Sequence, residues 1–90
     1  MLLIARIYAC TRAMLPITTM IAQTPAEFGR AVGARRRELG LTQEELAGVT
    51  GVNRRVVGEF EAGKITVRLG IAMELARSLG LDIELRPRGQ

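Results

Sequence analysis

Apolar residues recur every three or four positions through the middle of the chain, and this spacing predicts helices. In the first such stretch the repeat passes through Phe28, Val32 and Leu39. Thr24 can cap the helix, and a proline follows at the first helical position. Gly40 is a typical residue to end it. We therefore expect a first helix between residues 25 and 39.

The stretch LTQEELAGVTGVNRRVVGEFEAGK, residues 41–64, predicts two short helices joined by a tight bend. Thr42 and Glu45 have the spacing of a capping box at the start of the first helix, and Gly51 closes it. Asn53 is a suitable cap for the second helix. The buried side of the second helix is expected to consist of Val56, Val57 and Phe60.

A further helix is predicted between Thr66, its expected cap, and Gly80. Its inner face is expected to consist of apolar residues at helical spacing, namely Leu69, Ala72, Met73, Leu75, Ala76 and Leu79.

After Gly80 the apolar period changes to two, which is typical of a half-buried strand. Leu81, Ile83 and Leu85 share one face of this predicted strand, which stops at Pro87. A lone strand leaves backbone donors and acceptors without partners. Its partner could be the same strand of a second copy about a two-fold axis, or residues 2–8. The remaining alternative is a frayed tail.

Residues 1–24 are apolar and carry charge only at Arg6 and Arg12. These arginines lie inside the apolar run, which is not typical of a signal peptide. The charge-free stretch 13–26 is 14 residues long, shorter than the roughly 20 residues that span a bilayer. Three interpretations remain: a flexible arm, an extra element covering the core, or a start assigned too early, with Met14 or Met20 as the initiator. The chain thus divides into 1–24, 25–80 and 81–90.

The charge balance points to a polyanionic partner. Thirteen Lys and Arg residues, twelve of them Arg, oppose nine Asp and Glu, giving a net charge of +4 and a pI of about 10.6. A single cysteine, Cys10, and the absence of histidine predict neither a disulfide framework nor a zinc site, and they fit a reducing compartment. We expect no cofactor, no metal and no enzymatic activity, because the usual general base is missing.

Two short helices joined by a tight turn form a helix-turn-helix, whose second helix enters the major groove of DNA. Its outer side is expected to carry Arg54, Arg55, Gly58 and Glu59. Arginine pairs bidentately with guanine O6 and N7, so each half-site should contain a guanine. Glu59 could accept a hydrogen bond from cytosine N4, or it could pair with Arg55 one turn away.

The sequence resembles the XRE/Cro-type helix-turn-helix family of phage repressors and bacterial regulators. The resemblance is carried by the segment TQEELA, the turn GVN and the later segment EAGK. The resemblance covers residues 25–80. It implies an all-α, lambda-repressor-like bundle of four to five helices, with a short C-terminal β-strand paired across a dimer. TPAEFGRAVGARRRELG, a last helix and the terminal LDIEL look most like HipB-type antitoxins. Those are dimeric repressors that bind their own operators and a kinase-type toxin.

The resemblance also implies roles for individual residues. The base-reading positions of the family fall on Asn53, Arg54, Arg55 and Glu59. Arg36 and Glu61 match a pair that forms a buried or half-buried salt bridge between the first and third helices of this family. The residues expected at DNA phosphates are Thr42, Gln43, Lys64 and Arg36, with Arg30, Arg35 and Arg68 as further candidates.

We therefore expect a sequence-specific DNA-binding repressor that controls its own operon, as the antitoxin of a type II toxin-antitoxin pair. The expected partners are a double-stranded DNA operator, a second copy in a homodimer, and a HipA-like or other toxin, with no membrane. The expected location is the cytoplasm, at the nucleoid. The alternative is a protein-interaction module whose tails, 1–24 and 81–90, dock a partner without reading DNA.

Overall fold

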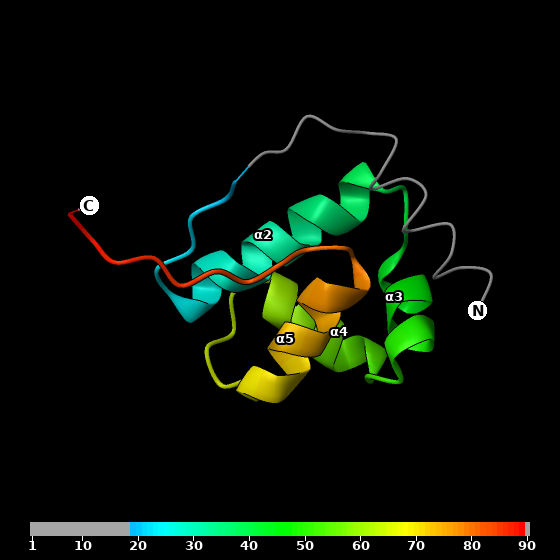
Figure 1. Ribbon diagram of the computed structural model, residues 1–90. Coiled ribbons are helices and arrows are strands. Elements are labelled where there is room, and N and C mark those ends of the chain that lie inside the picture. The colour runs from blue at the N-terminus through cyan, green and yellow to red at the C-terminus, as the bar shows by residue number, and fades with distance from the viewer. Residues whose placement is uncertain (1–18, 90) are drawn as a thin grey trace.

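The computed structural model describes residues 19–89, and four helices lie within this range (Figure 1). They are α2 (Pro25–Glu38), α3 (Gln43–Thr50), α4 (Arg54–Glu61) and α5 (Leu69–Ser78). The all-α prediction is confirmed. The predictions for the segment before residue 19, including strand pairing by residues 2–8 and the role of Cys10, lie outside the described residues.

The core forms where α4 packs against α2 and α3, and α5 packs against the same two helices. The side chains of Leu46, Val57, Phe60, Leu75 and Leu79 are almost completely buried there. The ring of Phe28, in α2, meets the ring of Phe60 edge to face with 5.3 Å between centroids. This packing fixes which side of α4 faces inward and which side stays outside.

The predicted caps of the first three helices are present. Thr24 Oγ1 accepts from the Glu27 backbone N–H at 3.1 Å, and Asn53 Oδ1 accepts from the Arg55 N–H at 2.8 Å. The capping box of α3 is complete, because Thr42 and Glu45 each bond the backbone of the other. Local sequence signals therefore suffice to place these helix starts.

The prediction for the start of the last helix was wrong. α5 begins at Leu69 rather than after Thr66, and its N-cap residue, Arg68, makes no side-chain capping bond. Leu69 and Met73, predicted to face inward, are 67% and 43% exposed. Ala72, between them, is buried in the core, so Leu69 and Met73 lie at the edge of the apolar stripe, where the rest of the described chain covers them only in part.

The predicted C-terminal strand is not formed in the single chain. Residues 81–89 extend away from α5 as a tail (Figure 1), and the described range contains no strand that could pair with them. Leu81 packs partly against the core, whereas Ile83 is 48% and Leu85 is 95% exposed. Pairing with a second copy stays a prediction. No helix within residues 19–89 is long and apolar enough to cross a membrane.

Candidate functional site

The turn between α3 and α4 sets the orientation of α4. Gly51 ends α3 in the left-handed conformation, with φ of 77°, which glycine adopts without steric cost. Val57 and Phe60 then hold one side of α4 in the core. As a result, the first turn of α4 and the side chains of Arg54 and Arg55 lie at the surface.

Arg54 and Arg55 are placed against the helix dipole. The first turn of α4 contains these two cations and no acidic residue, although the N-terminus of a helix favours negative charge. Within the described residues the Arg54 side chain makes no hydrogen bond or ion pair, and the Arg55 side chain is 85% exposed. A sequence selected only for folding stability would not place two arginines here, so they indicate a functional surface.

Glu59 lies one turn further along α4 and bridges two cations. Its Oε2 is 3.3 Å from Arg55 Nε, and its Oε1 is 3.2 Å from Lys64 Nζ. The hydrogen bond from Lys64, with the nearby charge of Arg55, holds the pKa of this carboxyl below its ordinary value. In the free protein Glu59 therefore adopts the ion-pair alternative, and it holds both cations at the same surface.

Arg36 and Glu61 form the buried ion pair that the sequence predicted. Arg36 Nε donates to Glu61 Oε2 at 2.8 Å, Nη2 donates to Oε1 at 2.9 Å, and Nη1 donates to the Leu41 carbonyl at 2.6 Å. Both residues are only 9% exposed. Because all three guanidinium nitrogens are engaged and buried, the geometry favours the structural role of Arg36 over a phosphate contact.

The carboxyl group of Glu61 is held in its charged form. Burial alone would raise the pKa of Glu61, but hydrogen bonds from Arg36 and Gln43 outweigh burial, and the pKa lies below its ordinary value. Gly33 provides the space for this side chain, because a Cβ at that position would lie 3.0 Å from Glu61 Oε1. A glycine within a helix, which sequence reasoning could treat only as a weakness, is thus part of the ion-pair site.

Gln43, the first residue of α3, is connected to the same ion pair. Its Nε2 donates to Glu61 Oε1 at 3.0 Å, in a half-buried position. Its Oε1 would lie 3.4 Å from a Cβ at Gly58. The Gln43 amide therefore lies across α4, and Gly58 is partly covered by it. The sequence predicted neither contact, because both depend on how α3 crosses α4.

Some features of the start of α3 favour a bound phosphate, and others oppose it. The helix N-terminus favours an anion, and Gln43 and Thr42 lie there. Glu44 and Glu45 also lie in the first turn, where Glu45 is engaged in the capping box. Any phosphate here must therefore be held by directed hydrogen bonds and by cations from neighbouring elements.

The other side chains predicted to contact the DNA phosphate backbone differ in whether they are free to do so. Arg30, Lys64 and Arg68 are all exposed, and Lys64 is paired with Glu59. Arg35 is half-buried, and its Nε donates to the Leu79 carbonyl at 3.2 Å at the end of α5. It thereby satisfies a helix C-terminus, which is a structural role.

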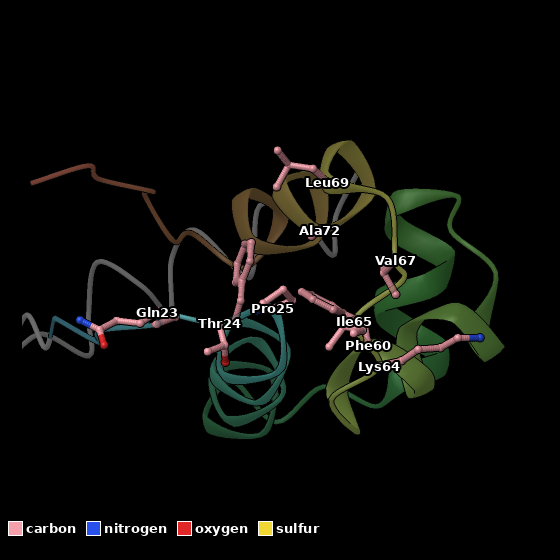
Figure 2. A pocket seen from close by; sticks show the side chains of 11 residues that line it. Gln23, Thr24, Pro25, Phe60, Lys64, Ile65, Val67, Leu69 and Ala72 are labelled. Atoms are coloured by element: carbon pink, nitrogen blue, oxygen red, sulfur yellow. The ribbon is translucent and has the colours of Figure 1, made fainter.

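An open apolar cavity of about 310 Å³ lies on another part of the surface, between the start of α2, the loop after α4 and the start of α5 (Figure 2). Phe28, Phe60, Ile65, Val67 and Leu69 contribute to its walls, and Figure 2 shows the amine of Lys64 directed away from it. The cavity contains no ionised group that could orient a ligand. In the described part of the chain, no cluster of His, Cys, Asp and Glu could hold a metal ion.

The sequence is similar to known regulators. A family model described as helix-turn-helix matches residues 32–85. Over 68 residues the chain is 40% identical to the uncharacterized HTH-type transcriptional regulator y4mF of Sinorhizobium fredii, covering 76% of this chain and 90% of that protein. Over 47 residues it is 49% identical to an uncharacterized HTH-type transcriptional regulator of Methanothermobacter thermautotrophicus, covering 52% of this chain and 68% of that protein.

The fold is similar to two solved structures. One is the HipB-O4 20mer complex, with a TM-score of 0.72 and 24% identity over 78% of this chain and 99% of that chain. The other is a HipB variant in an O2 20mer complex, with a TM-score of 0.73 and 24% identity over 79% of this chain and 99% of that chain. These likenesses confirm the predicted fold. Since the family model spans more than half of the sequence, and the rhizobial relative aligns over most of its length, the chain belongs to the helix-turn-helix family of transcriptional regulators.

Proposed function

We propose that the chain is a sequence-specific DNA-binding repressor that reads its operator with the first turn of α4. The supporting observation is the exposed pair Arg54 and Arg55, placed where the helix dipole disfavours cations and the fold gives Arg54 no partner among the described residues. In a helix-turn-helix the second helix inserts its N-terminal residues into the major groove. α4 has the matching arrangement, with its apolar side fixed in the core.

Arg54 and Arg55 carry base recognition in this proposal. Each guanidinium can donate two parallel hydrogen bonds to guanine O6 and N7. Asn53 lies at the same end of α4 and is exposed, although its Oδ1 is engaged as the helix cap. Its side-chain NH₂ remains a donor for a base or a phosphate. Glu59 holds Arg55 and Lys64 and is the more distant base-reading candidate.

Phosphate contacts supply affinity and register in this proposal. Lys64, Gln43 and Thr42 lie on the elements next to α4, and Lys64 can exchange its bond to Glu59 for a phosphate oxygen. Each neutralised phosphate releases counterions, so binding should weaken steeply as salt rises.

The repressor acts as a symmetric dimer in this proposal. Leu81, Ile83 and Leu85 alternate along a tail whose backbone has no strand partner in the described residues. Pairing with the same tail of a second copy would satisfy these groups and cover Ile83 and Leu85. Two recognition helices then reach half-sites one turn of DNA apart, roughly 34 Å.

We further propose that the repressed operon is its own and that it encodes a toxin, which this protein neutralises. The HipB likeness suggests this, and the exposed apolar residues Ile65 and Leu69 leave surface for a protein partner. A toxin gene of the HipA-like or another class next to this one would support the antitoxin role. If co-expressed protein from that gene neither binds this chain nor is inhibited by it, the antitoxin role is excluded while repression stands.

The test of DNA binding is a titration of the full chain against the duplex immediately upstream of its own gene, at two salt concentrations. We expect binding to that duplex to exceed binding to a shuffled duplex of equal length, and to fall steeply with salt. The interaction-module alternative predicts the same weak binding to both duplexes.

A further inference from the structure

We infer that Glu61 is a positioning residue for DNA binding, because it orients the Gln43 amide toward a phosphate. This inference rests on the proposed function. The Glu61 carboxylate receives three hydrogen bonds, two from Arg36 and one from Gln43 Nε2. An ionised carboxylate can only accept hydrogen bonds. The Gln43 amide must therefore turn its NH₂ group, and not its carbonyl oxygen, toward Glu61.

The amide has two ends of opposite character. If it were reversed, Gln43 Oε1 would face Glu61 Oε1, and two acceptors would oppose each other at about hydrogen-bond distance. The low pKa of Glu61 keeps its carboxyl ionised at neutral pH, so the reversed arrangement stays unfavourable. The buried ion pair therefore fixes the orientation of a side chain that is itself only half-buried.

The Gln43 amide keeps one donor for a ligand. Its NH₂ group has two hydrogens, and the bond to Glu61 Oε1 uses one of them. The other hydrogen has no acceptor among the hydrogen bonds of the described residues. Gln43 begins α3, the helix that crosses the phosphate backbone in this family. An amide fixed in advance at this place loses less rotamer freedom when it binds a phosphate oxygen.

Arg36 takes part indirectly. It holds Glu61 with two hydrogen bonds and is only 9% exposed, so burial keeps most of its guanidinium away from DNA. Its expected effect on binding therefore needs no direct phosphate contact. Arg36 fixes Glu61, Glu61 fixes Gln43, and Gln43 donates to the phosphate.

Methylphosphonate substitution measures the Gln43 contact. A set of operator duplexes, each with one neutral methylphosphonate, is titrated with the wild-type chain and with Gln43→Ala. We expect one position per half-site where the wild-type chain loses about tenfold in affinity and the variant loses much less, since a hydrogen bond to a charged group contributes on this scale. If the wild-type chain binds no operator duplex, the proposed function fails. If it binds but no position depends on Gln43, only the present inference fails.

A double variant separates positioning from folding. Arg36→Met with Glu61→Leu replaces the ion pair by apolar side chains, an exchange that often preserves stability. We expect this variant to show a cooperative thermal unfolding transition, as a folded protein does. Its affinity should no longer depend on the phosphate that Gln43 contacts. Adding Gln43→Ala should then cause no further loss of affinity. Unchanged dependence on that phosphate, or fully additive losses, would overturn the inference. The control Glu74→Gln removes an exposed carboxylate on α5 and should leave binding unchanged.

A measurement on the unaltered chain covers the case in which the double variant does not fold. NMR resolves the two side-chain amide protons of Gln43. Addition of operator duplex should shift one proton strongly, while the other keeps the shift of its bond to Glu61. If both protons shift alike, or neither does, Glu61 does not hold the amide for the phosphate.

Discussion

The guanidinium of Arg36 and the carboxylate of Glu61 face each other edge to edge, with Nε 2.8 Å from Oε2 and Nη2 2.9 Å from Oε1. This relationship joins α2 to the end of α4, the helix that carries the exposed arginines. Removing one partner leaves a buried charge without its counter-charge, so Glu61→Leu alone should cost about 3–5 kcal/mol of unfolding free energy. Urea unfolding of Glu61→Leu and of the double variant with Arg36→Met checks this. A single variant as stable as the double variant would contradict it.

The ion pair also predicts a pH dependence of stability. The pKa of Glu61 is lower in the folded chain than its ordinary value of 4.5, so the folded state favours the ionised carboxyl. Its stabilising contribution is therefore fully present above pH 4.5 and is lost as the pH falls through the lower, folded-state pKa. Urea unfolding over a series of acidic pH values should show this loss. The variant Arg36→Met with Glu61→Leu should show a shallower decline, and equal slopes would contradict the assignment.

Gly33 and Gly48 form a matched pair of helical glycines. A Cβ at Gly33 would press on Glu61 at 3.0 Å, whereas a Cβ at Gly48 would meet nothing within 4 Å. Gly48→Ala should stabilise the chain by about 0.5–1 kcal/mol through helix propensity. Gly33→Ala should forfeit that gain and destabilise the chain. Thermal unfolding of both variants tests this, and a stabilising Gly33→Ala would show that Glu61 can shift freely.

The exposed face of the C-terminal tail predicts the oligomeric state. Ile83→Lys with Leu85→Lys places charge on the face expected to be covered in a dimer, so sedimentation should show a shift from dimer to monomer. Asp82→Lys with Glu84→Lys adds the same side chains to the other face and serves as the control. If the wild-type chain sediments as a monomer at micromolar concentration, the proposed strand pairing is wrong.

Glu59 distinguishes an ion-pair role from base reading. Its carboxylate bonds Arg55 and Lys64 in the free protein, so Glu59→Gln should release both cations and remove a negative charge that faces DNA. We expect higher affinity for all duplexes, with unchanged preference among base pairs. Loss of preference at a single position would instead assign base reading to Glu59.

Much of the fold follows from local sequence signals. The capping residues Thr24, Thr42 and Asn53 each act within three residues of their own position, and the helical apolar period identifies most of the core. The exposure of Leu69 and Met73 in α5 was not predictable in this way. Both have the right period for the buried stripe, but periodicity does not indicate how wide a face of the helix its neighbours cover.

The candidate site, too, has features that local sequence predicts and features that it does not. The exposure of Arg55 follows from its place opposite Val57 and Phe60 on one helix, and that of Arg54 follows from its place as the first residue of α4. The bond from Gln43 to Glu61 joins residues 18 positions apart and depends on the crossing of α3 over α4. No local pattern contains that information, and an isolated glycine such as Gly33 appears unfavourable until the side chain beside it is known.

The most direct test concerns Arg54 and Arg55. Replacing both by alanine should leave helix content and melting temperature nearly unchanged, because neither side chain packs in the core. The control Arg77→Ala with Arg88→Ala removes the same charge from exposed positions elsewhere. Affinity for the upstream duplex, measured at one fixed salt concentration, should fall by about 100-fold or more in the first variant, as two bidentate base contacts are lost, and only slightly in the control. Equal affinity of the two variants for that duplex would contradict base reading by α4.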